Sequence, residues 1–106
     1  MRRPLLSLIA LCCAVSALAS ERIEGEIALS VPQCDLFVVQ TSRGFSLLRE
    51  DSHYSVFEGG RVRGQLHDRG SHEVEIVGEI TLWVTIEDWG LDLTQAKVIF
   101  YPRCRE

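Results

Sequence analysis

Apolar and polar residues alternate with a period of two along most of this chain, and the segment 80–87 shows the pattern most clearly. Its apolar side chains occupy every second position, namely Ile80, Leu82, Val84 and Ile86. Successive side chains of a strand point to opposite faces, so this spacing is typical of a strand with one buried face. The alternation therefore predicts a β-rich fold.

The same pattern recurs in short segments that are separated by turns. We expect strands at 23–31, 36–40, 45–49, 62–66, 74–76, 80–87 and 97–101, with a loop at 51–60 and one helical turn near 92–96. Asp92 and Gln95 have the spacing of a capping box, which favours that helical turn. Six or seven short strands predict an all-β fold, either a small antiparallel barrel or a compact sandwich. Gly25 and Gly64 lie within strands and suit the sharp bends of a small barrel.

The first twenty residues have the composition of a secretory signal peptide. Arg2 and Arg3 form a positive start, an apolar run follows, and Ala17 and Ala19 are small residues at the positions that a signal peptidase recognises. The apolar run is shorter than the ~20 residues that a spanning helix needs, which disfavours a permanent anchor. We therefore predict a signal peptide at 1–19 and a single domain at 20–106.

Removal of residues 1–19 leaves 87 of the 106 residues, which is enough for one domain. The count of lysine and arginine falls from 11 to 9, while all 15 acidic residues remain, so the formal net charge changes from −4 to −6. A domain of this charge repels phosphate backbones and anionic lipid heads. We expect no nucleic-acid partner, and no membrane span once the signal peptide is removed.

Two of the four cysteines leave with the signal peptide, and Cys34 and Cys104 remain. An even pair in an oxidising compartment predicts one intramolecular disulfide. The alternatives are an intermolecular bridge or a two-cysteine metal site, and the latter needs further ligands that no local spacing supplies.

Four segments resemble the strands and turns of small exported bacterial proteins of uncharacterised families with OB-like or SH3-like barrels. These segments are Cys34 to Thr41, Arg43 to Leu48, Glu58 to Leu66 and Trp83 to Gly90. The third is similar to the Gly-Asp-x-Val-x-Gly-x-Leu strand of such barrels, with Gly60 where Asp is usual. The resemblance implies an architecture and no catalytic residue, since a fold alone does not assign a function.

Metal binding and hydrolysis find little support in the pattern of polar residues. His67 and His72 flank the turn at 68–71, but a zinc site needs three or four ligands. Ser52 and His53 are neighbours in a polar loop, which we interpret as a chance pair, and the Gly-x-Ser-x-Gly turn of a hydrolase is absent from the sequence. We predict no catalytic residue, no metal ligand and no cofactor.

Aromatic and basic residues are the better candidates for binding, because tryptophan and arginine are enriched at contact hot spots. Trp83 lies on the polar side of the 80–87 strand, so it either covers the far side of the barrel or packs beneath the loop at 51–60, or it is an exposed anchor. Arg61 and Arg63 belong to a group of arginines that either receives an anionic ligand or pairs with neighbouring glutamates. The predicted binding residues are Trp83, Trp89, Arg61 and Arg63.

These features predict an exported, non-enzymatic β-barrel, periplasmic or secreted, that binds a protein or glycan partner in the cell envelope. The alternative is a structural or accessory envelope protein without a discrete ligand. A weaker alternative is a metal-binding or small hydrolytic protein that uses His67 and His72.

Overall fold

The computed structural model describes residues 22–105, which form six strands and one helix. The elements are β1 (Ile23–Ser30), β2 (Leu36–Thr41), β3 (Gly44–Glu50), β4 (Arg61–Gly64), β5 (Gly70–Ile76), β6 (Ile80–Leu91) and α2 (Leu93–Arg103). The predicted signal peptide at 1–19, with its cleavage site, lies outside the described residues.

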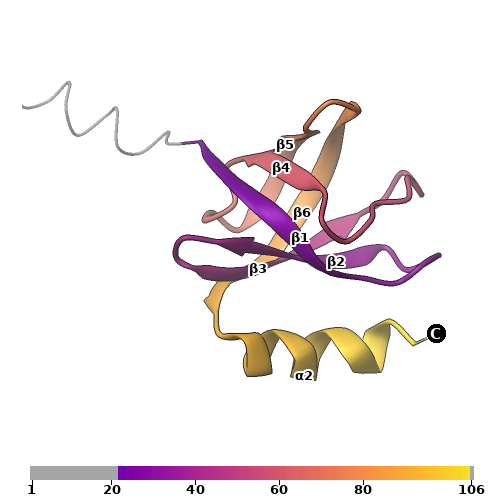
Figure 1. The fold of residues 1–106 in the computed structure, drawn as a ribbon, viewed down its shortest axis with the longest axis vertical. Coiled ribbons are helices and arrows are strands. Elements are labelled where there is room, and N and C mark those ends of the chain that lie inside the picture. The colour runs from indigo at the N-terminus through magenta and orange to yellow at the C-terminus, as the bar shows by residue number, and fades with distance from the viewer. Residues whose placement is uncertain (1–21, 106) are drawn as a thin grey trace, which may run out of the picture.

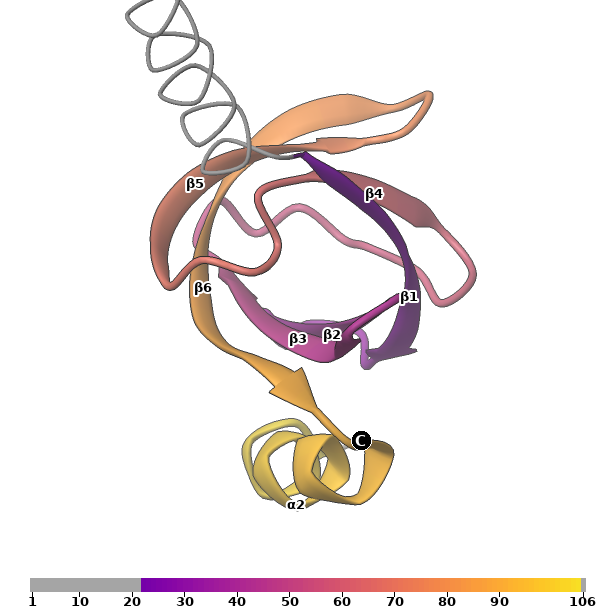
Figure 2. The same ribbon diagram turned by 90° about the vertical axis from the view of Figure 1, so that its left-hand side faces the viewer.

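The six strands form a closed antiparallel barrel in the order β1-β2-β3-β6-β5-β4. Figure 2 shows the strands around a ring, with α2 outside it. β4 returns to pair with β1, and β6 pairs with β3, so each strand has two neighbours. The prediction of a small antiparallel barrel is confirmed. The resemblance is confirmed only for this general architecture, because an OB-fold has five strands.

The barrel interior is filled by the inward rows of the alternating pattern. These buried residues are Ile27, Phe37, Val39, Leu48, Val62, Leu66, Val74, Ile76, Leu82, Val84 and Ile86. Gly25 and Gly64 are required where strands approach closely. A Cβ atom on Gly25 would lie 2.5 Å from Val39 Cγ1, and one on Gly64 would lie 2.8 Å from Val74 Cγ1. Any side chain there would push the barrel wall apart.

The outer face of β2 and β3 is also apolar, and α2 covers it (Figure 1). Leu36, Val38 and Leu47 point outward from the barrel and pack against the helix. The helix contributes Ala96 and Phe100, which stand four positions apart on one helical face and are fully buried. The segment 36–40 is apolar on both faces because one face lines the barrel and the other contacts α2.

The prediction of a last strand at 97–101 is wrong, because α2 continues through this segment to Arg103. The predicted capping box is present: the side chain of Asp92 accepts from the amide of Gln95, whose side chain accepts from the amide of Asp92. Once nucleated there, the helix buries Phe100 on the apolar face of β2 and β3. The six described strands already close the barrel, so a seventh strand would find no partner.

The predicted Cys34–Cys104 disulfide is present, with its Cα atoms 5.6 Å apart. It joins the connection before β2 to the residue that follows α2, and so ties the helix to the barrel at its far end. Among residues 22–105, no helix is both long enough and apolar enough to span a bilayer.

Candidate functional site

A groove of about 510 Å³ lies where two connections of the barrel meet. One wall is the segment 30–35, which comprises the last residue of β1 and the connection to β2, and the other is the segment 53–58 between β3 and β4. The lining residues are Ser30, Val31, Pro32, Gln33, Cys34, Asp35, His53, Tyr54, Ser55, Val56, Phe57 and Glu58. The lining combines apolar side chains with polar and charged ones, as in many ligand sites.

The second wall of the groove is fixed by the carboxylate of Glu50, which is only 2% exposed. This carboxylate accepts hydrogen bonds from the amide of Ser52 at 2.5 Å, from the amide of Tyr54 at 2.9 Å, and from the Ser52 hydroxyl. The turn that starts the 51–60 loop is therefore built around one buried acceptor. Such bonds to a charged group are stronger than neutral ones.

We expect Glu50→Gln to lower the free energy of unfolding by about 2 kcal/mol, because an amide replaces one acceptor oxygen with a donor that faces other donors. Amide exchange at Ser52 and Tyr54 should quicken before global unfolding does. Urea denaturation combined with site-resolved hydrogen exchange measures both effects. Asp51→Asn, an exposed neighbour, is the control, and an equal change in both variants would contradict the role of Glu50.

Further hydrogen bonds hold the two walls in place. The Ser30 hydroxyl donates to the carbonyl of Val56 at 2.7 Å, which joins the walls directly. The Tyr54 hydroxyl donates to Glu79 at 2.5 Å. The amide of Glu50 donates to the carbonyl of Asp35 at 2.8 Å, and the disulfide anchors the same segment. The groove is thus formed before any ligand arrives.

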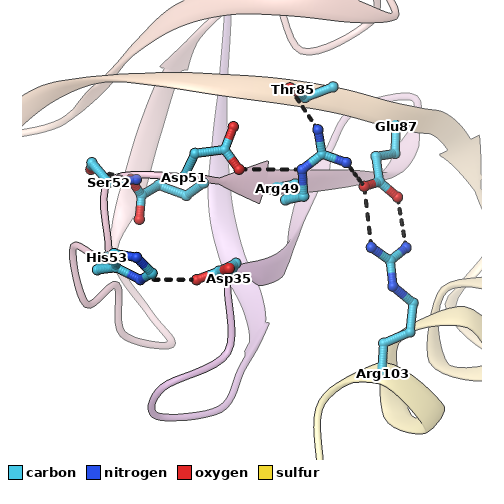
Figure 3. Close-up of polar contacts among 9 residues, drawn as sticks. Asp35, Arg49, Asp51, Ser52, His53, Thr85, Glu87 and Arg103 are labelled. Atoms are coloured by element: carbon cyan, nitrogen blue, oxygen red, sulfur yellow. Dashed lines mark hydrogen bonds and ion pairs between the residues drawn. The ribbon is translucent and has the colours of Figure 1, made fainter.

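The outer end of the 31–35 turn faces a second, more polar hollow of about 430 Å³. Figure 3 shows that Glu87 forms ion pairs with Arg49 of β3 and with Arg103 of α2. The nearest distances are 2.8 Å for Arg49 Nη1 and 2.7 Å for Arg103 Nη1. Two of the arginines that line the hollow are therefore paired with Glu87. The pair with Arg103 attaches the last turn of α2 to β6.

The guanidinium of Arg103, assisted by Arg49, lowers the pKa of Glu87 below its ordinary value, although partial burial opposes the shift. A lowered pKa in the folded state contributes stability above the ordinary carboxyl pKa, and this stability is lost as the pH falls.

We expect Glu87→Gln to lower the free energy of unfolding by about 1 kcal/mol at pH 7. The difference in this free energy between the variant and the wild type should shrink as the pH drops below about 5. Urea titrations at several pH values measure it. Glu73→Gln is the control, and a pH-independent difference would contradict the assignment.

The side chains of Ser52, His53 and Asp35 lie near one another without forming a nucleophile (Figure 3). His53 Nδ1 stands 3.6 Å from Asp35 Oδ1, so an acid does accompany the histidine. The Ser52 hydroxyl, however, donates to Glu50 rather than to the imidazole. A hydroxyl committed to a carboxylate in this way is not activated by the neighbouring histidine.

Trp83 is 64% exposed on the outer face of β6, so the interpretation that it is buried against the barrel or beneath the 51–60 loop is wrong. It stands opposite Glu73 of β5, whereas Arg63 of β4 stands opposite Glu75. Trp83 and the two predicted arginines are therefore two strands apart. Trp89 lies elsewhere, stacked on the ring of His67 at 5.1 Å between centroids.

The two arginines that were predicted as binding residues are paired with acids. Arg61 and Arg63 both contact Glu24, and Arg63 also contacts Glu75 at 3.2 Å. Arg69 pairs with Asp88 at 2.8 Å. Of the two interpretations, the pairing with neighbouring carboxylates is the one that the structure favours, and exposed pairs of this kind contribute little to stability.

His67 and His72 do not converge on one point. His67 Nε2 is 2.7 Å from the Thr41 hydroxyl, and His72 Nε2 is 3.1 Å from Asp68. Within residues 22–105, no cluster of three or more histidine, cysteine, aspartate or glutamate side chains has a geometry suited to a metal ion.

Sequence reasoning missed the groove and its buried carboxylate. The segment 51–60 was predicted only as a loop, because its composition is polar and it ends in two glycines. One signal was present in the sequence: Tyr54, Val56 and Phe57 are large apolar residues within an otherwise polar loop. The wall at 30–35 is distant in sequence from the wall at 53–58, and no pattern in its residues predicts a groove. The chain matches no protein-family model, no curated protein and no solved structure.

Proposed function

We propose that this chain is an exported, non-enzymatic binding domain that holds a protein or glycan partner in the cell envelope, in the periplasm or outside the cell. The observation that carries the proposal is the preformed groove of about 510 Å³ with exposed Phe57 at its margin. Large exposed apolar side chains beside a concave, partly apolar surface are typical of contact sites.

Two further features support export and binding. The disulfide favours an oxidising compartment, which agrees with the signal peptide predicted at 1–19. The groove walls are tied by the disulfide, by Glu50 and by Ser30, so little ordering entropy is lost when a partner docks. Metal binding or hydrolysis is less favoured, because His67 and His72 have separate partners and the Ser52 hydroxyl is bonded to Glu50.

A second candidate function is an accessory subunit of an envelope assembly. It is favoured by the outward side of α2, where Val98 is 67% exposed and Tyr101, three positions further on, is also exposed. A surface helix normally carries polar residues on its solvent side. This face is available for contact with another subunit.

The two candidates are separated by quantitative pull-down from envelope extract with the disulfide-bonded mature protein. We expect a protein or glycan that the wild type retains to be lost with Phe57→Ser and kept with Val98→Ser. Trp83→Ala tests the binding residue predicted from sequence. Loss with Val98→Ser alone would favour the accessory role, and full retention by Phe57→Ser would refute the groove as the contact surface.

A further inference from the structure

We infer that the groove takes an extended, positively charged segment of a partner protein, with a lysine or arginine side chain in contact with Asp35 or Glu58. This inference rests on the proposed function and specifies its ligand. The first observation is charge. The described residues that line the groove include two carboxylates, Asp35 and Glu58, and neither lysine nor arginine.

The second observation is that, in the described part of the chain, neither carboxylate is neutralised by a lysine or arginine side chain, in contrast to several acids elsewhere on the barrel. Glu24, Glu75, Glu87 and Asp88 all contact arginine side chains. Within residues 22–105, no guanidinium or ammonium group pairs with Asp35 or Glu58. Asp35 lies 3.6 Å from the imidazole of His53, and Glu58 accepts a hydrogen bond from the amide of Ser30 at 3.3 Å. A carboxylate has about four acceptor positions, so both retain capacity for a cation.

The third observation is the position of the carboxylates beside apolar surface. Asp35 belongs to one wall and Glu58 to the other, and Val31, Val56 and Phe57 line the groove with them. Lysine and arginine side chains bury their methylene stems on apolar surface while their charged ends remain at polar groups. An aromatic ring at the margin adds a cation–π contact. The lining thus complements both parts of a basic side chain.

A protein segment satisfies this lining better than a glycan or an anion does. A neutral sugar would leave both carboxylates without a counter-charge, and an anionic ligand would be repelled by them and by the net charge of −6 expected for the mature domain. The groove is lined by six consecutive residues on each side, so one partner segment can contact both walls at once.

The test is a titration of the disulfide-bonded mature protein, followed by amide chemical shifts, with two blocked peptides. The cationic probe is acetyl-Val-Lys-Val-Arg-Val-amide, and the anionic probe is acetyl-Val-Glu-Val-Glu-Val-amide. We expect the cationic probe alone to shift the amides of Cys34, Tyr54 and Val56. Its affinity should fall about fivefold in Asp35→Asn/Glu58→Gln and should weaken in high salt.

The matched control is Glu26→Gln/Glu73→Gln, which removes the same charge from exposed positions outside the groove and should bind the cationic probe as the wild type does. Unchanged affinity in the groove variant would overturn the inference. So would equal binding of the anionic probe, or groove shifts from neither probe at millimolar concentration. If Phe57→Ser loses the envelope partner but Asp35→Asn/Glu58→Gln retains it, the binding function stands and only its cationic specificity fails.

Discussion

Reduction of the Cys34–Cys104 disulfide is expected to lower the free energy of unfolding of the domain at 20–106 by about 4 kcal/mol. The bridge joins cysteines 70 positions apart, so opening it returns the freedom of a long loop to the unfolded chain. A domain of this length buries little surface and has a total stability near the lower end of the ~5–15 kcal/mol range. The thermal midpoint should therefore fall by roughly 15–30 °C.

Thermal and urea unfolding, followed by circular dichroism with and without dithiothreitol, measure this change. Cys34→Ala/Cys104→Ala should unfold within about 1 kcal/mol of the reduced wild type, since the remaining difference is a small change in packing. A loss of less than about 1 kcal/mol on reduction would show that the noncovalent packing of α2 holds the fold without the bridge.

Phe100→Ala is expected to lower the free energy of unfolding by about 3–5 kcal/mol, because a fully buried aromatic side chain leaves a cavity between α2 and the barrel. Phe100 packs in the cluster that joins the helix to Leu36, Val38 and Leu47. Those three side chains lie on the outer face of β2 and β3, so loosening of the helix would expose them as well. The variant should therefore also bind a hydrophobic dye before the barrel itself unfolds.

Urea denaturation measures the stability, and Tyr101→Ala is the matched control on the same helix. Tyr101 is 47% exposed and touches Phe100 only through an edge-to-face ring contact, so its truncation should cost about 1 kcal/mol or less. Equal losses in the two variants would indicate that the helix is held mainly by its ends, through the Asp92 cap and the disulfide, rather than by its buried face.

The barrel could be predicted from the sequence because each strand carries its own evidence. The alternation at 80–87 places Leu82, Val84 and Ile86 on the inward face, as the structure confirms. The loop at 51–60 was also predicted with its bounds, since β3 ends at Glu50 and β4 begins at Arg61. Local pattern and turn chemistry determine these features, and tertiary contacts do not oppose them.

The segment 97–101 shows where local evidence is insufficient. Its β-branched and aromatic residues favour a strand by propensity. The outcome depends on distant residues instead: β1 to β6 already close the barrel, and the apolar outer face of β2 and β3 needs a cover. The capping box at Asp92 was read correctly, but its pattern gave no length for the helix that follows.

The candidate site was harder to predict than the fold because its walls come from separate parts of the sequence. Trp83 and Arg63 were grouped by residue type, but the register places them two strands apart. The groove instead arises where the Ser30 hydroxyl contacts the carbonyl of Val56 and where the Glu50 carboxylate accepts hydrogen bonds from amides of the loop. Neither contact has a sequence signature, because each depends on strand pairing across the barrel.

The most direct test of the groove as the binding surface is photocrosslinking in intact cells. A photoreactive phenylalanine analogue replaces Phe57, and the same analogue at Trp83 or Val98 provides two exposed reference positions. We predict a discrete crosslinked product from position 57 and none from the other two. Crosslinks from position 83 or 98 with none from position 57 would contradict the proposed binding surface.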